Sequence, residues 1–165
     1  MVVHEIDPVY DEKSKILILG TMPSPKSRQA GFYYMHPQNR FWRVLGSVLN
    51  EDFSCGIEGK KRLLLKRHIA LWDVLSSCDI NKASDSSIKN PVPNDLEIIF
   101  SAADIKTVYL TGTTAYKLYK RFFKRAGVLL PSTSAANCRV STEKLFESYS
   151  VILEDLTDER GNFKA

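Results

Sequence analysis

The chain has 165 residues, a mass of 18.7 kDa and a composition that is 44% hydrophobic and 25% charged. This is the size and composition of one globular domain, so we expect a single domain over residues 1–165 and disfavour disorder, collagen-like repeats and a coiled coil. No apolar run approaches the roughly 20 residues of a membrane span, and the N-terminus lacks the basic and apolar regions of a signal peptide. We therefore expect a monomer without membrane contact, located in the cytoplasm, and associated with the nucleoid if the cell is prokaryotic.

The residues that most often bind metals or form disulfides are few and scattered. The chain has three cysteines and three histidines, with neither a C-x-x-C pair nor an H-E-x-x-H spacing. They are Cys55, Cys78, Cys138, His4, His36 and His68. This spacing predicts no disulfide framework, no metal site and no cofactor.

Basic residues are segregated, although the net charge is only +4. Residues 20–43 contain four Lys or Arg and no acid, and residues 113–125 contain five Lys or Arg and again no acid. Phosphates attract Lys and Arg in any sequence context, so these stretches indicate a surface for a polyanion. For residues 113–125, a solvated helix face is an equally good interpretation.

Strand-like and helix-like segments alternate along the first half of the chain. Residues 16–19 form a short apolar run of the kind that lies buried in a parallel sheet. Residues 39–50 carry a helical apolar stripe, and a helix is also expected over 60–67. Residues 69–75 read as the second strand.

The alternation continues to the C-terminus. Asn94 and Glu97 have the spacing of a capping box before a short helix. Strands are expected over 106–110 and 128–130, and helices are expected to begin at Thr113 and Ser141. This order predicts a three-layer α/β/α fold with a central, mainly parallel four-stranded sheet.

Three loops should lie beyond the carboxyl ends of these strands, where open α/β sheets bind ligands. They are residues 21–38, 76–94 and 131–140. The first is much longer than the roughly 2–6 residues usual for such turns, and we expect it to be structureless and functional. Neither phosphate-binding pattern, G-x-x-x-x-G-K-[ST] or G-x-G-x-x-G, occurs, which disfavours a P-loop or dinucleotide enzyme.

Two motifs in these loops carry a family resemblance. The segments G-T-M-P-S (20–24), S-R-Q-A-G-F-Y-Y (27–34) and H-P-Q-N-R-F-W (36–42) resemble the first motif region of the uracil-DNA glycosylase superfamily, in particular its hypoxanthine-DNA glycosylase branch. The segment P-S-T-S-A-A-N (131–137) is similar to the second motif of that branch. The resemblance implies a DNA-repair enzyme that cleaves N-glycosidic bonds.

The chain departs from the family at two positions. Met22 stands where the uracil-specific branches have Asp or Asn, and a thioether can neither orient a water nor stabilise positive charge. This departure counts against efficient uracil removal. Ala135 stands where the branch more often has proline, which leaves the second loop less rigid.

Asn39 is the predicted catalytic residue. Glycosidic cleavage passes through an oxocarbenium-like sugar and normally uses two carboxylates, yet residues 20–43 contain none, and we expect a carboxylate-free pocket. The amide oxygen of Asn39 can hold a water and its NH2 can donate to the base, and the resemblance places the catalytic asparagine at this position. The alternative role is to cap the following helix.

The remaining site residues fall into two predicted groups. A base must be extruded from the duplex, and stacking on an aromatic ring returns roughly 1–3 kcal/mol. We expect the base pocket to contain Gly20, Thr21, Met22, Pro23, Phe32, Tyr33 and His36, with Phe32 or Tyr33 as its floor and Tyr34 as a further candidate. We expect DNA contacts from Ser24, Ser27, Arg28, Arg40, Ser132, Thr133, Ser134, Asn137 and Arg139. Asp73 and Asp85 are weaker candidates for the pocket.

The sequence therefore predicts a monofunctional DNA glycosylase in base excision repair, which flips deaminated bases, chiefly hypoxanthine, and leaves an abasic site. Two alternatives are a uracil or G:T/G:U mismatch-specific glycosylase and a non-catalytic nucleic-acid-binding module. A nucleotide-binding hydrolase acting on small molecules is a weaker possibility.

Overall fold

Four parallel strands form the centre of the protein in a computed structural model that describes residues 1–81 and 84–165. The strands are β2 (Ile16–Gly20), β3 (Ile69–Asp73), β6 (Thr107–Thr111) and β7 (Val128–Leu130), in the order β3-β2-β6-β7. The apolar β2 is fully buried and pairs in parallel with both β3 and β6. The four predicted strands and the parallel sheet are confirmed.

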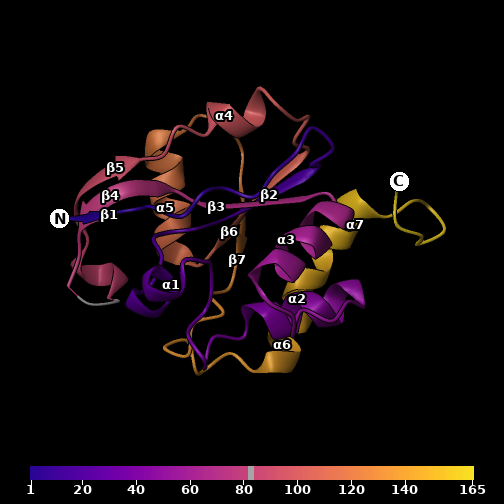
Figure 1. Cartoon of the computed structure of the whole chain (residues 1–165), viewed down its shortest axis with the longest axis horizontal. Helices are drawn as coiled ribbons and strands as arrows, with labels where there is room; N and C mark the ends of the chain where they lie inside the picture. Colours follow the sequence, from indigo (N-terminus) through magenta and orange to yellow (C-terminus); the bar gives the residue numbers. More distant parts are fainter. Residues whose placement is uncertain (82–83) are drawn as a thin grey trace.

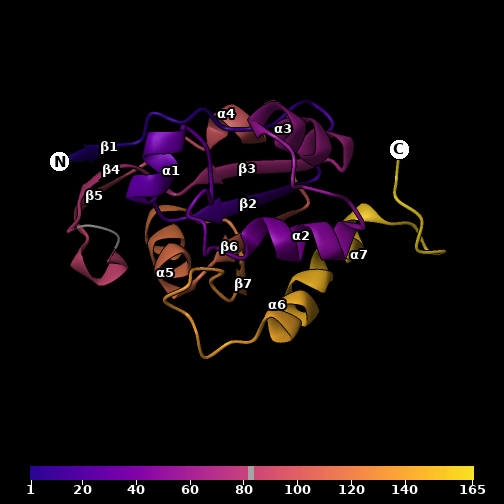
Figure 2. The same cartoon turned by 60° about the horizontal axis from the view of Figure 1, so that its bottom comes forward.

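Helices cover both faces of this sheet, which confirms the three-layer α/β/α fold (Figure 1). One face carries α2 (Phe41–Leu49), α3 (Ile57–Lys66), α6 (Thr142–Tyr149) and α7 (Leu153–Leu156), and the other carries α4 (Glu97–Phe100) and α5 (Thr113–Phe122). The apolar stripe of α2 is buried, and α2 packs against α6. Figure 2 shows these two helices lying together, below β2 and β3 in that view. A short 3-10 turn (Ser150–Ile152) joins α6 to α7.

The predicted loop 76–94 is instead part of a second, antiparallel sheet. Its strands are β1 (Val2–Val3), β4 (Leu75–Asp79) and β5 (Lys89–Pro93), in the order β1-β4-β5. The polar, half-buried residues of β4 hide its strand character from hydropathy, and partners distant in sequence stabilise it. A 3-10 turn (Asp85–Ser87) lies between β4 and β5.

The loop 21–38 also has regular structure. It contains α1 (Pro25–Ala30), which begins with proline at its first turn and is capped by the Ser24 hydroxyl accepting from the Ser27 N–H at 3.1 Å. The expectation of a structureless loop is therefore wrong. The serine cap and the proline in the first turn are local features that leave no apolar period in the sequence.

The predicted capping box before α4 is likewise wrong. Asn94 is buried, and its amide donates to the carbonyls of Asp73 and Leu75 at 2.9 and 3.0 Å. The Glu97 N–H is bound by the Asp95 carboxylate instead. Asn94 therefore braces the junction where the chain leaves β3 and enters β4, directly behind the site described next.

Candidate active site

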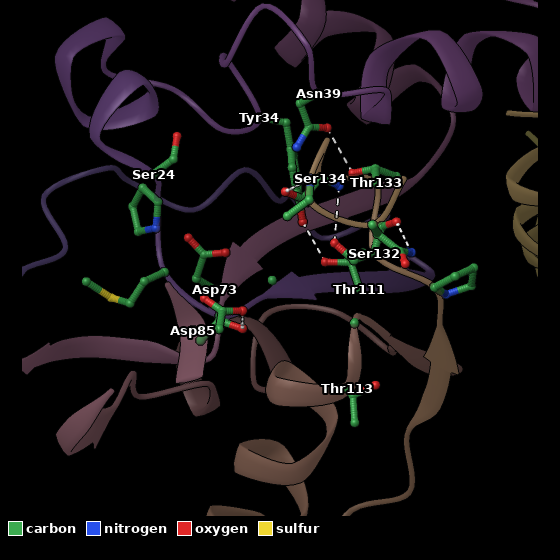
Figure 3. A pocket seen from close by; sticks show the side chains of 18 of the residues that line it. Ser24, Tyr34, Asn39, Asp73, Asp85, Thr111, Thr113, Ser132, Thr133 and Ser134 are labelled. Atoms are coloured by element: carbon green, nitrogen blue, oxygen red, sulfur yellow. Dashed lines mark hydrogen bonds between the residues drawn. The ribbon is translucent and has the colours of Figure 1, made fainter. Parts of the chain in front are cut away.

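A cavity of about 830 Å³ lies beyond the carboxyl ends of the four parallel strands. This volume is within the range of small-molecule sites, and the position is the one at which open α/β sheets bind ligands. The cavity is lined by the segment after β2, the 3-10 turn at Asp85, the start of α5 and the loop after β7. Figure 3 shows these segments converging from both ends of the chain.

The amide of Asn39 is fixed with its oxygen toward the protein. Oδ1 accepts hydrogen bonds from the Phe41 N–H and from the Thr133 hydroxyl, both at 2.8 Å. Because an amide oxygen has two lone pairs, both are occupied, and the backbone donor identifies which amide atom is oxygen. Within the described residues Nδ2 has no protein partner, and Asn39 lines the cavity.

This geometry modifies the predicted role of Asn39. Asn39 is not the cap of α2, because the N-cap residue is Arg40 and carries no side-chain cap bond; the bond from the Phe41 N–H instead ties Asn39 to the first residue of the helix, and it coexists with a place in the cavity wall. The expectation that the amide oxygen holds a water does not fit, because that oxygen is already bound twice. The NH2 group is the part that can reach a ligand.

A network of hydrogen bonds joins the first motif to the second. The Arg40 guanidinium donates to the carbonyls of Val140 and Asn137 at 2.6 and 3.1 Å, and its N–H donates to the Thr133 carbonyl. Thr133 is buried, at 1% exposure. Both residues position the loop around Asn39; the buried Thr133 does so in place of its predicted DNA contact, whereas the DNA contact of the half-buried Arg40 stays a prediction.

The expectation of a carboxylate-free pocket is wrong, because Asp73 and Asp85 both line the cavity. Asp73 ends β3 and is only 3% exposed. Asp85 comes from the 3-10 turn, and its carboxylate accepts from the Thr21 hydroxyl at 3.4 Å. Figure 3 shows both acids across the cavity from Asn39 and Thr133.

The surroundings of Asp85 raise the pKa of its carboxyl group. Although Asp85 is exposed as a residue, its carboxyl group faces the cavity, and removal from water raises its pKa. The nearby Asp73 charge raises it further, while the Thr21 hydrogen bond opposes the shift. We call the side of the cavity that Asp73 and Asp85 form its acidic wall.

Gly20 leaves room for two acceptor atoms at this wall. A Cβ added there would lie 2.6 Å from Asp73 Oδ1 and 2.9 Å from the Tyr34 hydroxyl. Thr111 Oγ1 donates to the Leu19 carbonyl at 3.3 Å, so in the 3.0 Å pair the Tyr34 hydroxyl is the donor to Thr111. Burial, reinforced by Asp73, raises the pKa of Tyr34 well above its ordinary value, which keeps this hydroxyl protonated.

The aromatic floor predicted from the sequence is corrected. Phe32 is fully buried, stacks on Trp42 at a centroid distance of 5.7 Å and does not line the cavity. Tyr33 lines it only with a trace of its surface, because the residue is 1% exposed and its hydroxyl donates to the backbone carbonyls of Ile6 and Asp7. Tyr34, which stacks on Phe41 at 3.9 Å, is the partly exposed ring.

Other predicted residues divide between the cavity and its surroundings. Those that line it are Gly20, Thr21, Met22, Pro23, Ser24, Ser27, Tyr33, Asn39, Ser132, Thr133, Ser134 and Asn137. Those that do not are Arg28, Phe32, His36, Arg40 and Arg139. His36 is turned to its own loop, where Nδ1 accepts from the Gln38 N–H, and Arg28 donates to the Pro23 carbonyl.

Two further predicted contacts have internal partners. Ser27 is 2% exposed, and its hydroxyl oxygen accepts from the Met35 N–H at 3.0 Å, so its predicted DNA contact is replaced by a role in holding the loop. Ser24 caps α1, as described above. Arg139 is exposed, and its DNA contact remains a prediction.

The sequence analysis did not predict that residues at the ends of β6 and β7 line the cavity. Thr111, at the end of β6, lines the cavity with Gly112 and Thr113 of the α5 start. Leu129 and Leu130 of β7 also face it. A usable signal existed for Asp73 and Thr111, since each is a polar residue that ends an apolar strand.

Two negative observations apply to the described residues alone. Across residues 1–81 and 84–165, the structure brings together no group of three His, Cys, Asp or Glu side chains that could hold a metal ion. In the same part of the chain, no helix combines the length and the apolar character needed to cross a membrane.

The fold is an α/β/α sandwich, and a cavity lined by many polar side chains lies at the carboxyl ends of its parallel strands. These two features define the class to which the protein belongs. The model of the uracil DNA glycosylase superfamily matches residues 8–157, and the chain belongs to that superfamily. It is a DNA glycosylase, and its substrate is DNA.

Named relatives are similar over most of their length. A hypoxanthine DNA glycosylase of Methanosarcina barkeri is 35% identical over 137 residues, covering 80% of this chain and 86% of the relative. One of Methanosarcina acetivorans is 31% identical over 149 residues, covering 87% and 94%. A solution NMR structure assigned to the uracil DNA glycosylases, also from Methanosarcina acetivorans, has a TM-score of 0.78 at 31% identity and covers 92% of this chain and 96% of its own.

Proposed function

We propose that this protein is a monofunctional glycosylase that flips a deaminated nucleotide into the cavity and hydrolyses its N-glycosidic bond, with hypoxanthine as the main base released. The observation that carries the proposal is the Asn39 amide, whose oxygen is bound twice by the protein while its NH2 group is left to face the cavity. The two relatives named hypoxanthine DNA glycosylases support the choice of base.

The chemistry follows from where charge develops. As the bond to the sugar breaks, negative charge moves onto the departing purine, and hypoxanthine presents O6 and N7 as acceptors. A fixed donor stabilises that charge without reorganising, which is where preorganised donors are most effective. The Asn39 NH2 group is held in such a position by Phe41, Thr133 and the Arg40 contacts around them.

Hydrolysis without strand cleavage is favoured over lyase chemistry. None of the described residues that line the cavity is a lysine, the usual source of a Schiff base. Met22 lines the cavity at the position where uracil-specific enzymes have Asp or Asn, which supports a purine base over uracil. A uracil or mismatch-specific enzyme is therefore the second candidate.

The test uses labelled duplexes that carry one deoxyinosine, uracil, xanthine or mismatched thymine. We expect free hypoxanthine in the supernatant and strand breaks only after alkali, with deoxyinosine as the fastest substrate. Breaks before alkali would show a lyase, and DNA binding without base release would show a non-catalytic module. A small-molecule hydrolase would bind its substrate with little salt dependence, whereas a DNA enzyme loses affinity steeply as salt rises.

A further inference from the structure

A buried histidine–aspartate pair lies behind the acidic wall of the cavity, outside both sequence motifs. His4 belongs to the segment between β1 and β2, and its Nε2 lies 2.9 Å from Asp73 Oδ2. The two side chains are 1% and 4% exposed. The imidazole is enclosed by Tyr33 and Trp72, with ring centroids 5.8 and 6.4 Å away, and the His4 N–H is anchored on the Ser76 carbonyl.

The hydrogen bonds of His4 determine its tautomer. The Ile6 N–H points at Nδ1 at 3.3 Å, and a backbone N–H can only donate, so Nδ1 is the acceptor. In the neutral ring the proton is then on Nε2, which donates to Asp73 Oδ2. The imidazole Nε2–H is thus the donor of this pair, and Asp73 Oδ2 is the acceptor.

The other oxygen of Asp73 is left for a ligand. Asp73 Oδ1 lies beside Gly20 at the cavity wall, 2.6 Å from the position of an added Cβ. None of the described residues donates a hydrogen bond to it. This oxygen borders the cavity, and a flipped base that displaced the solvent there would have to supply an N–H donor to avoid leaving it unpaired.

We infer that Asp73 determines base specificity by accepting a hydrogen bond from a protonated ring nitrogen, and that His4 positions Asp73 for this contact. The inference rests on the proposed function. Hypoxanthine presents N1–H, whereas adenine, from which deamination produces it, presents an unprotonated N1 that the carboxylate oxygen repels. The Tyr34 hydroxyl oxygen, next to Oδ1 at the same wall, is a second acceptor that suits the same N–H.

The two walls then complement one base. Across the cavity the Asn39 NH2 group is a donor for the purine's acceptor atoms, and Asp73 is an acceptor for its donor. A site that leaves a buried polar group unpaired with the wrong base discriminates far better than an apolar pocket does. The deaminated base satisfies both walls, while the normal base leaves the acidic wall unpaired.

Asp73→Asn is the decisive variant. His4 would still donate, now to the Asn carbonyl, so the NH2 group would turn toward the cavity and replace an acceptor by a donor. Single-turnover rates are measured on deoxyinosine and on 2′-deoxynebularine, a purine nucleotide with an unprotonated N1 and no O6. We expect the ratio of the two rates to fall by about 100-fold, chiefly through lost activity on deoxyinosine. An equal fall on both substrates would overturn the inference, because it would show that the charge alone matters.

His4 is tested with a matched pair of variants. His4→Phe keeps a ring between Tyr33 and Trp72 but removes the donor, whereas His4→Gln retains an N–H donor. We expect His4→Phe to lower the same ratio by about 10-fold and His4→Gln to restore most of it. Should both variants lose the same activity on both substrates in proportion to a lower Tm, His4 is only structural and the positioning role is wrong.

The failure of this inference is distinguishable from that of the proposed function. If the wild-type protein releases no base from either substrate, the glycosylase proposal itself fails. If the wild-type protein is active and Asp73→Asn leaves the substrate ratio unchanged, only the specificity role fails. Asn39→Ala is the reference variant, since it should slow both substrates by a similar factor.

Discussion

The two walls of the cavity are built by the same device with opposite polarity. On one wall, the protein binds the Asn39 oxygen and leaves a donor; on the other, it binds one Asp73 oxygen and leaves an acceptor. In each of these two side chains, the atom that the protein binds fixes the direction in which the unbound atom points. For the amide of Asn39 the bound atom decides that the free one is a donor, whereas the carboxylate of Asp73 is an acceptor at either oxygen and its bound atom fixes only the direction.

The walls also differ in how far along the chain their supports lie. Asn39 is held by Phe41, two residues away, and by Thr133, which a second motif supplies. Asp73 is held by His4, 69 residues earlier and outside any motif. The side of the cavity formed by Asn39 is thus held partly by a neighbour in sequence, while Asp73 on the acidic wall is held by a residue that only the folded chain brings near it.

The largest expected effect comes from removing the donor. Asn39→Asp keeps an oxygen for Phe41 and Thr133 but has no NH2 group, so we expect kcat on deoxyinosine to fall by about 10²–10³-fold, the usual loss for one preorganised donor. Asn39→Ala, which also loses the bonds to the Phe41 N–H and the Thr133 hydroxyl, should fall at least as far and lower the free energy of unfolding by about 1 kcal/mol. Single-turnover kinetics and thermal unfolding measure the two effects. Near wild-type rates in either variant would leave the bond to the Phe41 N–H as the role of Asn39.

A smaller effect is expected from the residue that holds the donor in place. Thr133→Val removes the hydroxyl that binds Asn39 Oδ1 without changing the volume at this buried position. We expect kcat to fall by about 10-fold and stability by about 1 kcal/mol, because the amide regains freedom to rotate and one hydrogen bond is lost. Thr133→Ser retains the hydroxyl and is the control. Equal rates in the Val and Ser variants would show that the hydrogen bond from the Thr133 hydroxyl does not orient the Asn39 amide.

The smallest effect concerns the acidic wall and depends on pH. The pKa of Asp85 is raised in the folded protein, so folding favours its protonated form and ionisation there costs stability. The cost is absent below the ordinary pKa of an aspartate, grows as pH rises to the raised folded pKa, and is constant above it. Asp85→Asn removes it, and we expect the Tm to rise by about 1–2 °C at pH 7, a small change because the Thr21 hydrogen bond to the carboxylate offsets part of the cost.

The control for Asp85 is the same comparison below pH 3.5, where the wild-type carboxyl is protonated and the gain in Tm should disappear. A gain of equal size at both pH values would show that the substitution acts through packing rather than charge. Differential scanning calorimetry at the two pH values makes this distinction.

Much of the site was predictable where the signal is local. The motif around Asn39 identified a residue that lines the cavity, and the segment 131–137 identified the loop that binds it. The choice of Phe32 failed because its burial depends on Trp42, which the sequence places ten residues away without indicating that the two rings stack. The internal partners of Arg40 were not predictable either, since Asn137 and Val140 lie about 100 residues further on.

The sequence by itself determined the four strands, the layer order and the place of the ligand site. Short apolar runs must be buried on both faces, and helices with one apolar stripe must cover them. Tertiary structure alone decided the chemistry of the cavity wall. Hydrogen bonds between distant segments decide that the NH2 group of Asn39 and one oxygen of Asp73 face inward, and the pairing of β4 with β1 and β5 shapes the hairpin whose turn carries Asp85. Which atom of a side chain faces the cavity depends on contacts that form only when the chain has folded.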